Sequence, residues 1–377
     1  MIVTFPHMGN TYITAKALLD DLGLEYIIPP FSVKKALEIG TKYAPEFACL
    51  PLKINLGNFI QAYQQGADTI LITGGRGPCR FGYYCEMHRE ILRDNGYDMD
   101  VIALEVPNGD LKEFFRRIKK LAGTLNIHKL CKIAANVTLV AKMVDELESF
   151  VFRTRPRELE KGSTDKIYGR FLKDVMKVKG SAEIMSLVKK TIEEISRLNI
   201  DNTVKPFKIG IVGEIYTTID INSSFEIESK LGSMGAEIHR PVNVSGWIIE
   251  HIIKHALHLP RNLRYAEAAK PYLGTMIGGH AQETVGNTVL FAKDGFDGVI
   301  QIYPLTCMPE IVAQSILPAI ERDFDIPILT LIIDEMTGEA GCYTRLEAFM
   351  DLLQKRRERK EAIDKEEFNE KNMLFGN

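Results

Sequence analysis

The sequence has too few cysteines, at the wrong spacing, for a protein held together by disulfides. Six cysteines occur in 377 residues, whereas small disulfide-dense domains carry far more per residue. No two cysteines form a Cys-x2-Cys pair, the local hairpin on which structural zinc sites are usually built. Five residues separate Cys79 from Cys85, which fits neither a zinc knuckle nor a ferredoxin run. Neither kind of local cysteine framework is therefore expected.

The sequence also lacks a large net charge and a long apolar run. The 47 basic and 50 acidic side chains leave a formal net charge of -3, which gives no reason to expect nucleic acid or an anionic membrane as a partner. No apolar run approaches the roughly 20 residues that a membrane helix needs. Residues 1–6 lack the basic and then apolar pattern of a signal peptide. We therefore expect a soluble cytoplasmic protein.

Three common catalytic motifs are missing. There is no Gly-x4-Gly-Lys-[Ser/Thr] phosphate loop, so the sequence gives no support for nucleotide hydrolysis by this chain. No Gly-x-Gly-x-x-Gly follows the first expected strand, and the glycines of residues 74–77 match it only superficially. No His-Glu-x-x-His occurs.

Short apolar runs alternate with helical patterns in two parts of the chain. In the first part, the expected strands are residues 2–5, 26–28, 69–73 and 101–106. In the second part, they are residues 208–213, 298–303 and 328–333. Alternation of this kind predicts mainly parallel sheets. We expect an N-terminal α/β domain (1–110), a helical connecting segment (111–205), a C-terminal α/β domain (206–356) and a charged tail (357–377).

The two α/β regions share a spacing. Gly57-Asn58 is followed after seven residues by Gly66-Ala67-Asp68 and a strand, and Gly286-Asn287 is followed after seven residues by Gly295-Phe296-Asp297 and a strand. A cysteine comes 11 residues after the first aspartate and 10 residues after the second. An internal repeat of one α/β unit is the simplest interpretation, with chance similarity as the alternative.

Four cysteines occupy comparable places, close to the expected start of a helix: Cys49, Cys79, Cys307 and Cys342. In parallel sheets, ligands bind beyond the carboxyl ends of the strands, and helix N-termini lower thiol pKa values and favour thiolates. Thiolates that converge from distant positions indicate a metal site, either iron–sulfur or zinc. Cys131, flanked by apolar residues in the helical segment, is expected to be a buried core thiol.

The motifs around these cysteines resemble those of the 2-hydroxyacyl-CoA dehydratase D-component superfamily. The resemblance spans nearly the whole chain and is strongest to the acyl-CoA dehydratase activase-related branch, whose relatives include the double-cubane cluster proteins. The segments that carry it are Ala48-Cys49-Leu50-Pro51, Gly74-Gly75-Arg76-Gly77-Pro78-Cys79-Arg80-Phe81-Gly82-Tyr83-Tyr84, Thr306-Cys307-Met308-Pro309-Glu310, Thr337-Gly338-Glu339-Ala340-Gly341 and Thr344-Arg345-Leu346-Glu347-Ala348-Phe349.

The resemblance implies two Rossmann-like, mainly parallel α/β domains that hold an oxygen-sensitive iron–sulfur cluster in the cleft between them. It also implies a partner, a separate dimeric ATPase of actin/Hsp70-like fold that carries its own cluster and delivers low-potential electrons. The missing phosphate loop agrees with ATP being used on that partner. A small-molecule substrate is expected, and a homodimer of this chain is compatible with the family.

By motif, Cys49, Cys79 and Cys307 match the recurring cysteines of the family and are the expected metal ligands. Cys85 and Cys342 lie inside family motifs and are further candidate ligands. Their participation decides the expected cluster type. Three ligands suit a [4Fe-4S] cluster with one open iron, whereas five or six permit a double cubane of [8Fe-9S] type.

Three arginines in the same motifs are candidates to offset the negative charge of a cluster by donating to sulfide or thiolate: Arg76, Arg80 and Arg345. The alternative is that they anchor their loops through ion pairs with residues such as Glu86, Glu310 or Glu347. His7 and His280 lie in loops near the inferred cleft and are candidate proton donors, with a structural role as the alternative.

The function expected from these features is that of an iron–sulfur reductase or electron-transfer protein supplied by the ATPase. We rank a radical 2-hydroxyacyl-CoA dehydratase component below it, because no feature identifies a CoA site and dehydratases of this type normally use two related subunits. A non-catalytic cluster carrier or assembly scaffold, and a zinc-stabilised binding module, also remain open.

Overall fold

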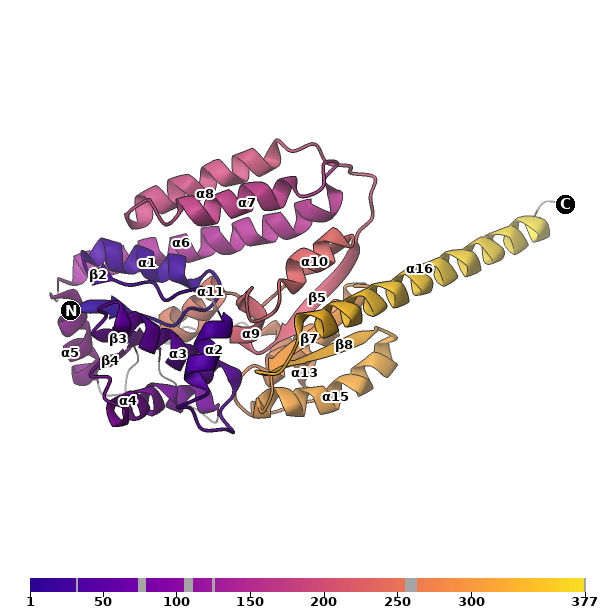
Figure 1. Cartoon of the computed structure of the whole chain (residues 1–377). Helices are drawn as coiled ribbons and strands as arrows, with labels where there is room; N and C mark the ends of the chain where they lie inside the picture. Colours follow the sequence, from indigo (N-terminus) through magenta and orange to yellow (C-terminus); the bar gives the residue numbers. More distant parts are fainter. Residues whose placement is uncertain (32, 74–78, 105–110, 124–125, 255–262, 376–377) are drawn as a thin grey trace.

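The computed structural model describes residues 1–31, 33–73, 79–104, 111–123, 126–254 and 263–375, with the backbone alone for 111–115, 251–252 and 366–375. The chain is α/β, with two four-stranded sheets whose strands are all parallel (Figure 1). This arrangement confirms the predicted α/β class with parallel sheets and is consistent with two Rossmann-like domains. Within the described ranges, no helix has both the length and the apolar composition needed to cross a membrane.

The first sheet has the strand order β2-β1-β3-β4. Its register pairs Val3 of β1 with Tyr26 of β2 on one side and with Thr69 of β3 on the other. The strands are β1 (Ile2–Thr4), β2 (Glu25–Tyr26), β3 (Thr69–Ile72) and β4 (Asp100–Ala103). The helices of this part are α1 (Thr11–Leu22), α2 (Val33–Gly40), α3 (Leu50–Gln64), the 3-10 helix η1 (Arg80–Tyr83), α4 (Tyr84–Asp94) and α5 (Leu111–Ala122).

The second sheet has the corresponding order β6-β5-β7-β8. The apolar strand β7 is buried along its whole length because it pairs on both sides, with β5 and with β8. The strands are β5 (Phe207–Gly213), β6 (Ala236–His239), β7 (Gly298–Pro304) and β8 (Ile328–Ile333). The helices are α9 (Ile215–Ile219), α10 (Ile227–Ser233), α11 (Val244–Trp247), the π-helix η4 (Ile248–Ile253), α13 (Arg264–Ala269), α14 (Ala281–Lys293), α15 (Met308–Phe324) and α16 (Glu339–Phe375).

The helical segment between the sheets shares its core with both of them. Figure 1 shows α6 (Ile127–Thr154), α7 (Ser163–Asp174) and α8 (Gly180–Ser196) stacked over α1, with the short η3 (Arg155–Arg157) after α6. One hydrophobic cluster includes Val3 of the first sheet, Val144 of α6 and Ile209 of the second sheet. The three predicted regions are therefore packed around a common core rather than separated by linkers.

Several boundaries differ from the sequence expectation, and strand β6 was not expected from the sequence. Helix α3 begins at Leu50, which places Cys49 directly before its first turn. The boundary expected at residue 356 falls inside α16, which continues as one helix to Phe375. Figure 1 shows the C-terminal half of α16 projecting away from the rest of the chain. Its sequence is so densely charged that a solvated helix is the stable form there.

Polar contacts connect the two α/β halves. The backbone N–H of Gly9, after β1, donates to the Asp220 carboxylate after α9 at 3.1 Å. The buried Lys53 ammonium of α3 donates to the Glu335 carboxylate after β8 at 2.7 Å. These contacts bring the loops beyond the carboxyl ends of both sheets together.

Candidate metal centre

Three of the predicted ligands each directly precede a helix. Cys49 is the N-cap residue of α3, Cys79 that of η1 and Cys307 that of α15. Cys79 comes after β3 and Cys307 after β7, which occupy the same position in the strand order of their sheets. The sequence prediction that these thiols lie at helix starts is therefore confirmed.

Arg80, which follows Cys79, hydrogen-bonds to the loops that precede Cys49 and Cys307. Its guanidinium donates to the carbonyl oxygen of Phe47 at 2.8 Å and to the carbonyl oxygen of Thr306. The Thr306 hydroxyl also donates to the Phe47 carbonyl, at 3.3 Å. Residues 226 positions apart in the sequence are thus joined through one side chain. The side chain after Cys79 therefore connects the loops that carry the other two thiols.

Thr306 has a backbone conformation that is unusual for its residue type. Its φ of 69° lies in the left-handed region, which costs a β-branched residue about 1–3 kcal/mol. The next residue, Cys307, donates its N–H to the carbonyl of Pro304 at 3.0 Å, which closes the turn. Because strain of this kind persists only where surrounding contacts hold it, the Arg80 contact and this turn fix the direction in which the chain enters Cys307.

The loop that contains Gly279, in the second α/β half, packs close to Pro309 and to the Cys79 sulfur. Gly279 has a φ of 53°, and a Cβ added to it would stand 2.8 Å from the Pro309 ring and 3.8 Å from the Cys79 sulfur. Only a residue without a side chain allows this approach. The next residue, His280, is the N-cap residue of α14 and lies 3.9 Å from the Glu283 carboxylate. The structure therefore places His280, a predicted proton donor, next to a loop that contacts the thiol region.

Cys49 has a close polar partner in Tyr84, the first residue of α4. The Tyr84 hydroxyl oxygen lies 2.5 Å from the Cys49 sulfur and accepts the backbone N–H of Cys49 at 3.3 Å. Both side chains are buried, in a small cluster that also contains Leu52. Tyr84 belongs to a motif singled out in the sequence, but nothing in the sequence connected it with Cys49.

Burial raises the pKa of all three thiols, to about 12 for Cys49. The Glu214 carboxylate raises these pKa values too, because its negative charge disfavours thiolates. The Arg80 guanidinium lowers the pKa of Cys49 and Cys79, but by less than burial raises it. The expectation that helix starts make these cysteines thiolates is therefore wrong for the free thiols. A bound cation or cluster would favour their ionised forms.

Two buried carboxyl groups, Glu214 and Glu310, lie near the thiols and influence their pKa values. Glu214 caps α9 by accepting the N–H groups of Tyr216 and Thr217, each at 3.0 Å, and burial raises its pKa. Glu310, in the first turn of α15, is fully buried, and burial raises its pKa to about 7. Gln301 donates to it at 2.9 Å. No sequence motif marks Glu214, whereas Glu310 stands within the Cys307 motif as a proposed partner of arginine.

Among the described residues, the other candidate cysteines have different neighbours from the three thiols. Cys85 packs in an apolar cluster with Leu56 and Phe59, on the core side of α4. Cys342 packs in a different cluster with Leu346 on α16. Cys131 is exposed on α6, so the prediction that it is a buried core thiol is wrong.

The remaining candidates have separate surroundings. Arg345 donates to the Thr330 carbonyl of β8 at 2.6 Å, so it anchors α16 to the edge of the second sheet. Arg76 lies outside the described residues. His7 is buried beside Asp220, 3.8 Å from it, and burial lowers its pKa. A histidine that is neutral at pH 7 is a weak proton donor.

The donor set suits a cluster better than a single ion. In the part of the chain that is described, no three His, Cys, Asp or Glu side chains gather closely enough to hold one metal ion. A zinc ion needs its ligands about 2.3 Å away and hence close to one another, whereas an iron–sulfur cluster spreads its thiolate ligands over several irons. Cys49 and Cys307 are buried, Cys79 is half-buried, and all three stand at helix starts, so they would supply the soft ligands that such a cluster requires.

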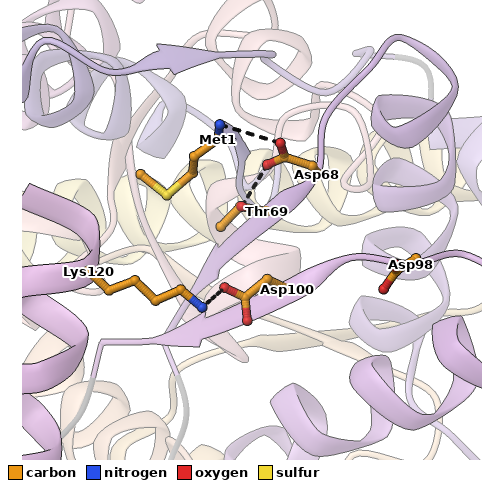
Figure 2. A pocket seen from close by; sticks show the side chains of 6 residues that line it. All are labelled: Met1, Asp68, Thr69, Asp98, Asp100 and Lys120. Carbon is orange, nitrogen blue, oxygen red and sulfur yellow. Dashed lines mark hydrogen bonds and ion pairs between the residues drawn. The ribbon is translucent and has the colours of Figure 1, made fainter.

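A surface pocket that none of the three thiols lines is formed mainly by charged side chains. Figure 2 shows it at the amino ends of β3 and β4, lined by Asp68, Asp98, Asp100 and Lys120 with Met1 and Thr69. The terminal ammonium lies 3.5 Å from the Asp68 carboxylate, and Lys120 pairs with Asp100. The thiols follow the opposite, carboxyl ends of the strands, so this pocket is not part of the candidate centre.

No model of a known protein family matches the chain, and no curated protein matches it either. The assignment to the dehydratase D-component superfamily therefore stays a prediction from the motifs.

The contacts of Arg80 give a testable role for that side chain. Arg80→Ala removes both carbonyl contacts, so we expect the free energy of unfolding to fall by about 1 kcal/mol and bound iron to be lost to a chelator faster. Arg93→Ala is the matched control, since Arg93 pairs with two exposed carboxylates, those of Glu90 and Asp94. Urea unfolding and chelator-driven iron release measure both effects. Identical behaviour of the two variants would contradict the role of Arg80.

Proposed function

We propose that this chain is an iron–sulfur protein that receives low-potential electrons from a separate ATP-hydrolysing activase and acts as a reductase or electron-transfer protein. The observation that carries the proposal is the placement of Cys49, Cys79 and Cys307. All three stand at helix starts, their loops are joined through Arg80, and they come from both α/β halves. The cluster would lie between these halves, with these thiols as ligands.

An internal repeat fits the two halves and belongs to the same proposal. The two sheets share their strand order. In each half, the glycine of the repeated spacing packs against a carbonyl of the preceding helix. An added Cβ would lie 1.9 Å from the Ala36 oxygen at Gly57, and 1.9 Å from the Tyr265 oxygen at Gly286. Equivalent halves would present Cys79 and Cys307 from equivalent positions.

Three thiols favour a [4Fe-4S] cluster over a double cubane of [8Fe-9S] type. The thiols of Cys85 and Cys342 pack in separate apolar clusters, and that of Cys131 is exposed. A fourth iron without a cysteine ligand could bind a small substrate directly. The same feature supports the second candidate function, a component of a radical 2-hydroxyacyl-CoA dehydratase, since a substrate carbonyl can occupy an open iron.

The surrounding side chains would tune such a cluster. When bound, the cluster supplies one-electron transfer at low potential. Cys49 and Cys307 are only 8% and 7% exposed, so the protein keeps water away from their sulfurs. The positive charge of Arg80 favours thiolates, and the carboxylates of Glu214 and Glu310 oppose additional negative charge. Exclusion of water together with nearby carboxylates favours the oxidised cluster and thus a low potential.

The test of this function is ATP-dependent reduction. Protein purified without oxygen is mixed with a purified ATPase of the actin/Hsp70-like, cluster-carrying class, and the visible absorption of this chain is followed. We expect bleaching only when the ATPase, ATP and a primary reductant are all present. Reduction of a small substrate by the bleached protein would distinguish a reductase from a cluster carrier. Bleaching that is independent of ATP and of the ATPase would contradict the proposal.

A further inference from the structure

Tyr84 links two of the segments that form the candidate metal centre. It begins α4, five residues after Cys79 in the sequence, yet its hydroxyl contacts Cys49, which lies 35 positions earlier. Its side chain is 4% exposed, with its ring 5.7 Å from that of Phe81 and 6.2 Å from that of His88. These packed neighbours hold the ring in place, so the hydroxyl is directed at Cys49 by the fold.

The two contacts of the hydroxyl define which group is the donor. The Tyr84 oxygen accepts the backbone N–H of Cys49 at 3.3 Å, and the Cys49 sulfur lies 2.5 Å away. A tyrosine hydroxyl carries a single proton. Once the sulfur is a thiolate bound to metal, it has no proton left, so only the tyrosine can donate between them.

We propose that Tyr84 is a positioning residue that holds Cys49 in place for the cluster and sets the cluster's reduction potential through an O–H···S hydrogen bond. This inference rests on the proposed function. Hydrogen bonds to thiolate ligands draw electron density from the sulfur, which stabilises the reduced cluster and raises its potential. Tyr84 would thus counteract the effect of the Glu214 and Glu310 carboxyl groups on the potential.

The test compares Tyr84→Phe with Tyr83→Phe, both in full-length protein purified without oxygen. Tyr83 is the neighbouring residue and is 64% exposed, so it controls for the loss of one tyrosine hydroxyl. We expect Tyr84→Phe to retain iron, to show a lower midpoint potential than wild type in a redox titration, and to lose iron to a chelator roughly tenfold faster. Tyr83→Phe should match wild type in both measurements.

Site-specific replacement of Tyr84 by 3-fluorotyrosine covers the case in which Tyr84→Phe does not fold. Fluorine makes the hydroxyl a stronger donor with little change in shape, so the potential should move upward. A midpoint potential that is the same in wild type, Tyr84→Phe and the fluorotyrosine protein would overturn the role of Tyr84 while leaving the cluster intact. Absence of iron from the wild-type protein would instead overturn the proposed function on which the inference rests.

Discussion

Replacing Cys307 by alanine should prevent binding of the proposed cluster and remove the stability that the cluster would contribute. Among the three proposed ligands, Cys307 alone comes from the second α/β half, whereas Cys49 and Cys79 come from the first. A cluster bound by all three joins the halves covalently, so part of its binding free energy is folding free energy. We expect iron per chain to fall close to zero and the urea midpoint to match that of wild-type protein stripped by a chelator.

Two cysteine variants act as controls for this prediction. Cys131→Ala removes an exposed thiol, and Cys85→Ala removes a thiol in an apolar cluster. Cys131→Ala should leave both iron and stability unchanged. Cys85→Ala should keep its iron and lose about 1 kcal/mol through imperfect packing. Unchanged iron in Cys307→Ala would refute a centre shared between the halves. Loss of about half the iron in Cys131→Ala or Cys85→Ala would instead indicate a double cubane.

A second large effect concerns acidic pH. His88 of α4 is fully buried, and its Nε2 atom lies 3.3 Å from the carbonyl oxygen of Leu52. Burial lowers its pKa from 6.5 to about 4. Because His88 binds a proton less readily in the folded protein than in the unfolded chain, its protonation favours unfolding. The stability that is present above pH 6.5 is therefore lost as the pH falls from 6.5 toward 4. The lowered pKa of His88 corresponds to a loss of about 3 kcal/mol in the free energy of unfolding.

The contribution of His88 is measured as the difference in the free energy of unfolding between wild type and a His88 variant. Other buried groups also titrate, and burial raises the pKa of Glu310 and Glu228, each to about 7, which has the opposite effect on stability. We therefore expect the gap between wild type and His88→Gln to change by about 3 kcal/mol between pH 7 and pH 4, in favour of the variant at low pH. His128→Gln, at an exposed position on α6, should follow wild type. Parallel pH profiles for wild type and His88→Gln would contradict this assignment.

The fold could be predicted because its signals are local. The strands β3, β7 and β8 are runs of β-branched and apolar residues, and the helices between them follow a clear alternation. What could not be predicted was the packing of the middle segment. Its exposed charges suggested a separate connector, but the apolar face of α6, with residues such as Val144 and Leu147, is buried in the core that both sheets share.

The candidate centre was only partly predictable, because part of it is defined by tertiary packing rather than by local sequence. Motifs identified Cys49, Cys79 and Cys307, because each stands beside a recognisable helix start. The partners that define their environment, Glu214 and Tyr84, come from elsewhere in the chain, and no short-range pattern encodes such contacts. Burial has the largest effect on the thiol pKa values and likewise depends on tertiary packing, so reasoning from helix starts alone predicted their ionisation in the wrong direction.

The same limit applies to Cys85 and Cys342. Their motifs made them further candidate ligands, but both thiols pack in apolar clusters, Cys85 on α4 and Cys342 on α16. A one-residue shift along a helix rotates a side chain by about 100°. Membership of a motif therefore does not decide whether a thiol faces a shared site.

The most direct test of the account is the iron and acid-labile sulfide content per chain of protein purified without oxygen. The three-thiol centre predicts about four iron and four sulfide per chain. About eight irons with slightly more sulfide would contradict the three-thiol arrangement and favour a double cubane. Little or no iron, with one zinc per chain, would contradict the iron–sulfur function itself.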